Sequence, residues 1–250
     1  MWRSSTLASY IKLNKLMNSN KKTSRIIFLF WVLYAVPAIF SLQYVQPKLI
    51  VLGDAVATSN NIIGHEFLFR MGIVSHLLAQ IFLLFFGMTV FHLFKGVNKT
   101  WAAIFWTSIL MTVAITFINT LNFVGPLIVL SKADYLNVFQ QDQLHAFVMI
   151  FLRLSNFGQA LYEVFWGMYL FAFGLLIIKS SYIPRFLGVL LIIGSIGFPI
   201  NTFTKLLIPE FYPALFTQMT MFFSGLGVLP TLFWILIVGL KINTQTIDKQ

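Results

Sequence analysis

Residues 146–178 read AFVMIFLRLSNFGQALYEVFWGMYLFAFGLLII. A helix needs about 20 apolar residues to cross the hydrocarbon layer of a membrane, and this run is longer than that. Four strongly polar side chains interrupt it and share one helical stripe about 120° wide: Arg153, Asn156, Gln159 and Glu163. A carboxyl group in lipid is costly and usually faces a protein interior or a water-filled cavity. The run therefore predicts a membrane-spanning helix with one polar face.

The composition of the chain is typical of a membrane protein. Of its 250 residues, 58% are hydrophobic and only 10% are charged, whereas soluble domains have about 25% charged residues. The mean hydropathy of +0.85 agrees with this difference. A water-soluble globule is therefore excluded. The sequence has no cysteine, which also excludes disulfides, thiolate nucleophiles and thiolate metal sites.

Six apolar segments follow one another along the chain: 26–45, 68–94, 101–130, 146–178, 186–207 and 215–240. We therefore expect an all-α polytopic membrane helix bundle with six transmembrane helices, in one transmembrane domain at 25–241. Residues 1–24 are a basic N-terminal segment, expected either as a short surface helix near anionic lipid or as a disordered tail. Met17 is a plausible alternative start, and residues 242–250 are expected to be a cytoplasmic tail.

Positive charges predict the orientation of the bundle. They are concentrated at both ends of the chain and in two short connections: Arg3, Lys12, Lys15, Lys21, Lys22, Arg25, Lys95, Lys99, Lys179, Arg185, Lys241 and Lys249. Lysine and arginine are enriched in cytoplasmic loops, so both termini are predicted to be cytoplasmic. The formal net charge of +10 thus indicates topology. Membrane lipids, and not nucleic acid, are the expected partners.

The acidic residue Glu163 is expected in the outer half of the membrane. Counted from Lys179 at about 1.5 Å per residue, it lies about 24 Å from the cytoplasmic face of a layer about 30 Å thick. Similar counting places further polar residues near this depth: His76, Gln80, Asn119 and Asn122. Arg70 and Arg153 lie near the outer interface and are predicted to be anchors. Glu66 is placed for an i,i+4 ion pair with Arg70.

These polar groups predict a ligand-binding site that opens outward. The leading hypothesis is binding or transport of a small amphiphilic or lipid-like molecule, with Glu163 as its anchor. The side chains expected to orient this molecule are Asn156, Gln159, His76, Gln80, Asn119 and Asn122. One alternative is a membrane-embedded enzyme in which Glu163 and a histidine act as acid and base. Another is a structural or sensory protein in which these groups only form hydrogen bonds between helices.

Sequence motifs for metals, cofactors or catalysis are absent. The pair His65-Glu66 is not followed by the second histidine of a zinc-protease motif. His65, His76 and His145 could converge on a metal from the outer side, but their spacing has no ligand signature. There is no phosphate-binding loop, dinucleotide fingerprint or nucleophile elbow. We therefore expect no cofactor, no metal and no catalytic residue.

Several separated motifs occur in a recognisable order: KLIVLGDAVAT at 48–58, NNI at 60–62, VNKT at 97–100, SKADYL at 131–136, IPRFLG at 183–188 and NTFT at 201–204. In this order they resemble the bacterial DUF 4386 family, a domain of unknown function, over roughly residues 17–240. The resemblance implies a bacterial multi-span protein of the inner membrane. It implies no activity.

Overall fold

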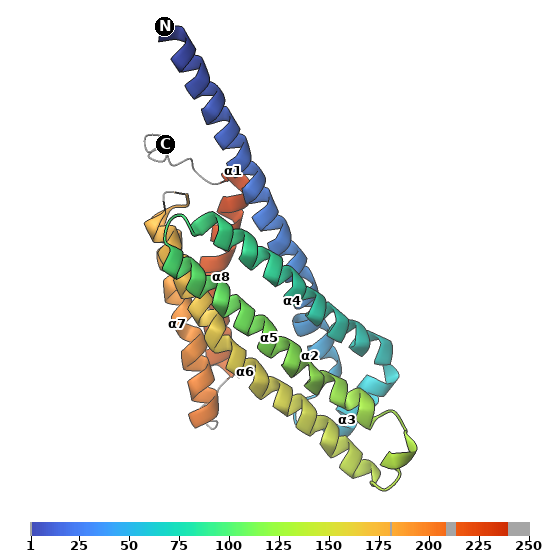
Figure 1. Cartoon of the computed structure of the whole chain (residues 1–250). Coiled ribbons are helices and arrows are strands. Elements are labelled where there is room, and N and C mark those ends of the chain that lie inside the picture. The colour runs from blue at the N-terminus through green and yellow to red at the C-terminus, as the bar shows by residue number, and fades with distance from the viewer. Residues whose placement is uncertain (1, 181, 209–213, 240–250) are drawn as a thin grey trace. The chain divides into compact units, whose positions relative to one another are not determined.

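A computed structural model describes residues 2–180, 182–208 and 214–239 (Figure 1). Side chains are described from residue 21 onward, except for most of those between 214 and 224. Every regular element in the described part of the chain is helical, so the predicted all-α fold class is confirmed. The expected tail at 242–250 and the side chains of the first 20 residues lie outside the described parts.

Most long helices coincide with the predicted apolar segments, but the first one begins within the basic N-terminal segment. They are α1 (Trp2–Ile39), the π-helical turn η1 (Phe40–Val45), α2 (Gln46–Leu49), α3 (Ala55–Gly64), α4 (Glu66–Phe94), α5 (Lys99–Val129), the 3-10 turn η2 (Asp134–Leu136), α6 (Gln141–Lys179), α7 (Arg185–Leu207) and α8 (Ala214–Ile237). Five segments are long and apolar enough to cross a membrane, namely Lys21–Leu49, α4, α5, α6 and α7. The predicted sixth segment coincides with α8. The apolar part of α8 with described side chains, Gly225–Ile237, is shorter than the five segments above.

Local signals in the sequence explain where several helices begin. The Asp54 carboxylate accepts a hydrogen bond from the Ala57 backbone N–H at 2.8 Å and so caps α3. The Asn98 side chain caps α5 in the same way. Pro184 directly precedes α7, a position where the missing N–H of proline costs no helical hydrogen bond. These caps end the connections between the apolar segments at defined residues.

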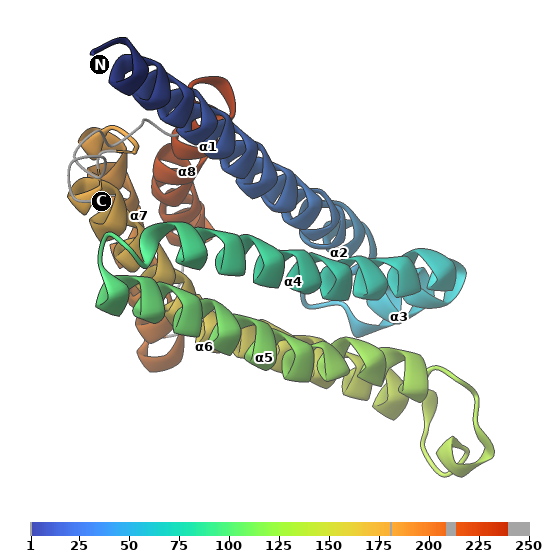
Figure 2. The same cartoon turned by 45° about the horizontal axis from the view of Figure 1, so that its top comes forward.

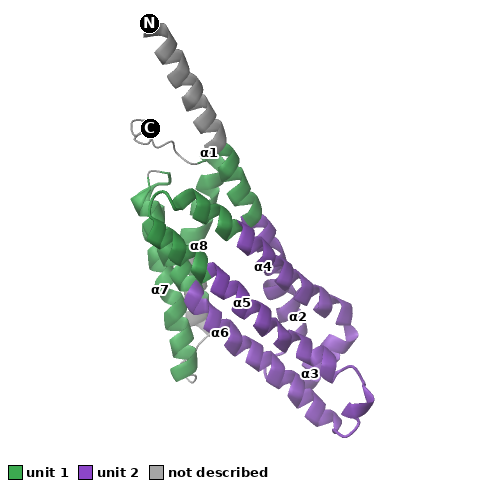
Figure 3. Cartoon of the chain, viewed as in Figure 1, with its two compact units in different colours: residues 1–30, 86–108, 166–250 green, residues 31–85, 109–165 purple. Residues whose placement is uncertain are grey.

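The chain divides into two compact units (Figure 3). Unit 1 comprises residues 1–30, 86–108 and 166–250, and unit 2 comprises residues 31–85 and 109–165. In unit 1, α7 packs against α8. A Cβ added at Gly174 of α6 would lie 2.6 Å from the carbonyl oxygen of Gly188 in α7, so these two backbones approach closely because neither residue has a side chain.

Unit 2 has an apolar core of its own. Its buried residues come from η1, α2, α3, α4, α5, η2 and α6, and they are Val45, Leu49, Ile62, Phe69, Val129, Leu136, Leu144, Val148 and Leu152. Within this unit α5 runs beside α6 (Figures 1 and 2). A Cβ at Gly125 would overlap the Phe151 ring, so the two helices are in close contact. Unit 2 contains all the residues that the sequence predicts for the ligand site.

Many large apolar side chains are exposed on the outer surface of the helices. On α4 of unit 2, Val74, Leu78, Ile81 and Phe85 are exposed at helical spacing. Exposed apolar surface of this extent marks contact with another apolar phase. In a chain with several helices long enough to cross a bilayer, that phase is lipid.

Candidate functional site

Glu163 of α6 is deeply buried in unit 2. It is 5% exposed, and it is the only buried acidic residue among those that the structure describes. The Gln159 amide Nε2 donates a hydrogen bond to its Oε1 at 3.2 Å. Tyr162, 2% exposed, lies within electrostatic range of both Glu163 and Tyr34 of α1. One carboxyl group, one amide and two phenol groups therefore lie around Glu163.

The predicted polar stripe on α6 divides between two environments. Glu163 is buried and Gln159 is half-buried, whereas Arg153 and Asn156 are exposed. The buried face at this level of the helix passes through Leu152 and the small residue Ser155. Ala160 and Tyr162 are also buried, so burial on this part of α6 does not follow the predicted stripe.

Asn119 joins α5 to α6, and Asn122 supports it from the same helix. The Asn119 amide Nδ2 donates a hydrogen bond to the backbone carbonyl of Ser155 at 2.9 Å. The Asn122 amide Nδ2 donates one to Asn119 Oδ1 at 3.0 Å. A Cβ at Gly158 would overlap the Asn119 amide, so this glycine makes room for the bond. Asn119 therefore contributes to helix packing, as the structural alternative predicts for such amides.

His76 and Gln80 lie one turn apart on α4 and are 5% and 4% exposed. The Gln80 amide Nε2 reaches the His76 backbone carbonyl at 3.5 Å. His76 Nδ1 and Gln80 Oε1 are buried, and neither has a hydrogen-bond partner among the described atoms. An unpaired buried polar atom costs about 1–3 kcal/mol. These two atoms are therefore available to a bound molecule.

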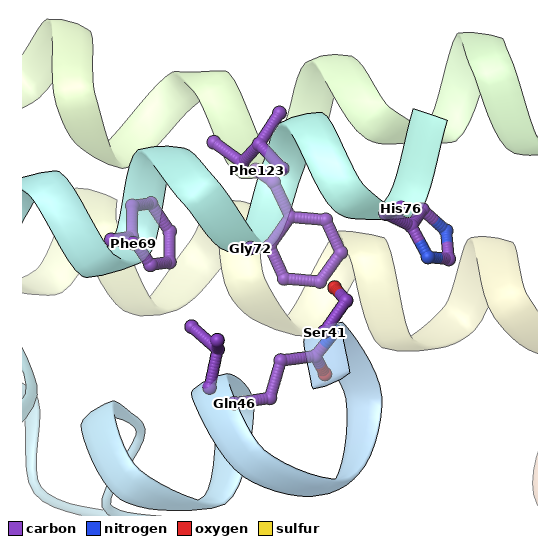
Figure 4. A pocket seen from close by; sticks show the side chains of 8 residues that line it. Ser41, Gln46, Phe69, Gly72, His76 and Phe123 are labelled. Carbon is purple, nitrogen blue, oxygen red and sulfur yellow. The ribbon is translucent and has the colours of Figure 1, made fainter. Parts of the chain in front are cut away.

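A small pocket opens beside His76 (Figure 4). It lies where η1 and α2 meet α4 and α5, and its lining residues are Ser41, Val45, Gln46, Phe69, Gly72, Ile73, His76 and Phe123. Space for the centre of a water-sized molecule is about 10 Å³, which is roughly the room that one water needs. Ser41 and Gln46 were not predicted as site residues. The sequence feature that indicates an irregular helix here is Pro37, which interrupts the helical hydrogen bonds just before these residues.

The predicted ion pair at the start of α4 is confirmed. Arg70 and Glu66 are 2.7 Å apart, and their side chains are 56% and 53% exposed. Within the described residues, His, Asp and Glu side chains do not form a group of three that could hold a metal. The convergence of His65, His76 and His145 that the sequence left open is thus not found there.

Taken with the apolar spans, the helical fold defines an integral membrane protein with a small polar site inside a helix bundle. Residues 28–239 match the family described as "Domain of unknown function (DUF4386)". The chain belongs to this family, as its motifs predict. Comparison with curated proteins and with solved structures found no significant match.

Proposed function

We propose that this protein binds or transports a small amphiphilic or lipid-like molecule through an outward-facing polar pocket, with Glu163 as the polar anchor. The protein would be a six-span protein of the bacterial cytoplasmic membrane with both termini in the cytoplasm. Gln159, hydrogen-bonded to Glu163, orients the carboxyl group. His76 and Gln80 offer further polar atoms to the molecule. Asn119, which accepts a hydrogen bond from Asn122, holds α5 against α6.

The observation that carries this proposal is the burial of the Glu163 carboxyl. Helix packing alone is served equally well by amides and hydroxyls, as Asn119 illustrates. An ionisable group inside a membrane bundle is expensive and is usually retained for a ligand, an ion or a proton. The 5% exposure of Glu163 therefore favours a functional role for its carboxyl over a purely structural one.

Equilibrium binding tests the role of Glu163. The purified protein in lipid nanodiscs is titrated with radiolabelled dodecylamine, dodecanol and dodecanoic acid, which share one chain and differ in the head group. We expect saturable binding of at least one of them. Glu163→Gln should weaken this binding by about tenfold to a hundredfold, because a hydrogen bond to a charged group contributes about 1.5–3 kcal/mol.

Glu66→Gln is the matched control, because Glu66 is an exposed acid of the same unit. It should bind like the wild type. Melting temperatures of both variants show whether the fold is intact. Absence of saturable binding for all three probes, or equal binding by Glu163→Gln and the wild type, would refute the proposal.

The proposed orientation has its own test, which the absence of native cysteine makes simple. Gly96→Cys lies in the basic connection between α4 and α5, and Val138→Cys lies between α5 and α6. A membrane-impermeant maleimide should label Val138→Cys in intact spheroplasts and Gly96→Cys only after lysis. The reverse pattern would overturn the cytoplasmic assignment of the termini.

A further inference from the structure

The pocket beside His76 owes its shape to an irregular first span. Pro37 lacks the N–H that would bind the carbonyl four residues earlier. Just beyond it, Phe40–Val45 winds as a π-helix, and the Gln46 N–H donates to the carbonyl of Ser41, five residues earlier. Such wide turns are rare and are frequent at functional sites. The turn brings Ser41, Val45 and Gln46 to the pocket.

The opposite wall is formed by α4 at a residue without a side chain. A Cβ added at Gly72 would lie 2.8 Å from Val45 Cγ1, so the π-helical turn approaches the α4 backbone closely. His76, one turn further along α4, lines the same pocket (Figure 4). Its ring packs against Phe123 with centroids 6.4 Å apart. The imidazole is thus held in place at the pocket, although its Nδ1 lacks a partner among the described atoms.

The lining contains no charged residue. Its polar side chains are Ser41, Gln46 and His76, and its other walls are apolar. An ionic head group would lose its hydration here without gaining a counter-charge, which is strongly unfavourable. A hydroxyl group can donate or accept a hydrogen bond and therefore suits either tautomer of His76. Its oxygen is also about the size of a water, which is what the volume of about 10 Å³ admits.

We propose that this pocket binds one uncharged hydroxyl group, that of an alkyl alcohol or a similar neutral amphiphile, through His76. Because the volume of about 10 Å³ admits only the hydroxyl group, the alkyl chain would extend out of the pocket. This inference rests on the proposed function only in taking the bound molecule to be an amphiphile. It concerns the His76 end of the site, and its test is read out at the His76 ring.

Nuclear magnetic resonance of histidine side chains tests the proposal. The protein is labelled with ¹⁵N in its four histidines and titrated in nanodiscs with dodecanol, dodecane or dodecanoate. Dodecanol should shift the His76 resonance saturably, whereas dodecane and dodecanoate should not. His92, an exposed histidine on the same helix whose Nδ1 contacts the Met88 carbonyl at 2.8 Å, is the internal control and should not shift.

Two variants sharpen the test. His76→Phe keeps a planar ring but removes both ring nitrogens, and it should weaken saturable dodecanol binding by about tenfold. Gly72→Ala leaves every polar group in place but adds a methyl group against Val45, and it should also weaken binding. The melting temperature of each variant shows whether it is folded. Glu66→Gln, at an exposed acid of the same unit, should leave the His76 response unchanged. The His76 resonance reports on this pocket, whereas the binding assay of Glu163→Gln reports on the proposed function, so the two proposals can fail separately.

Three outcomes would overturn the proposal. A His76 resonance that shifts equally with dodecane would show a general effect of alkyl chains on the bilayer. A resonance that exchanges magnetisation with water and does not respond to dodecanol would show that water alone occupies the pocket. Unchanged dodecanol binding by folded His76→Phe would show that the alcohol binds elsewhere.

Discussion

Replacing Gly158 by alanine tests the hydrogen bond that joins α5 to α6. The added methyl group would overlap the Asn119 amide, which donates to the Ser155 carbonyl at 2.9 Å and accepts from Asn122 at 3.0 Å. Asn119 is 7% exposed and cannot simply turn into solvent. Gly158→Ala therefore forces either loss of both hydrogen bonds or a shift of α5 away from α6.

The expected destabilisation follows from these contacts. Loss of the Asn119 bond to α6 and of the Asn122 bond within α5 costs about 0.6–2 kcal/mol each. Overpacking adds about 1–3 kcal/mol, and the higher helix propensity of alanine returns about 1 kcal/mol. The net loss of folding free energy is about 3 kcal/mol. Thermal unfolding of the purified protein in detergent, followed by tryptophan fluorescence, measures the change against the wild type.

A matched control and a double variant complete this test. Gly64→Ala adds the same methyl group at the end of α3, where it meets no packing neighbour within 4 Å, and it should keep or slightly raise stability. In the double variant, Asn119→Ala removes the side chain that Gly158→Ala would overlap. The double variant should therefore be about as stable as Asn119→Ala alone, since residues in contact are not additive. Additive effects, or a Gly158→Ala variant as stable as Gly64→Ala, would refute the described contact.

Three further substitutions test other parts of the structure. Asp54→Ala removes the cap of α3 and should cost about 1 kcal/mol, seen as faster hydrogen exchange in Ala55–Gly64, while Asp54→Asn should behave like the wild type. Glu66→Gln breaks an exposed ion pair and should change unfolding free energy by less than about 1 kcal/mol; a larger loss would contradict its exposure. Gly174→Ala places a methyl group 2.6 Å from the Gly188 carbonyl oxygen and should lower the melting temperature, whereas an unchanged melting temperature would contradict this close approach.

Much of the fold could be predicted because hydropathy is a property of each segment alone. The apolar runs locate α4, α5, α6 and α7 to within a few residues. The Arg70–Glu66 pair was also predictable, because both partners lie on one helix, four residues apart. Burial of Glu163 was expected from the cost of a carboxyl group in lipid.

The candidate site was predicted less completely, because its contacts join different helices. Sequence spacing placed Arg153 and Asn156 on the same stripe as Glu163, yet only the packing of neighbouring helices decides how much of that stripe is buried. The bond from Asn119 to the Ser155 carbonyl spans 36 positions and has no local signature. The π-helical turn that supplies Ser41 to the pocket was likewise not foreseen.

By itself the sequence determined that this chain is a helical membrane protein, since apolar length and charge placement depend only on the order of residues. Only the tertiary structure decided that His76 borders a pocket and that Asn119 joins α5 to α6. The physical reason is that hydrogen bonds and cavities depend on distances of a few ångströms between separate helices. Those distances are set by packing at small residues such as Gly72 and Gly158.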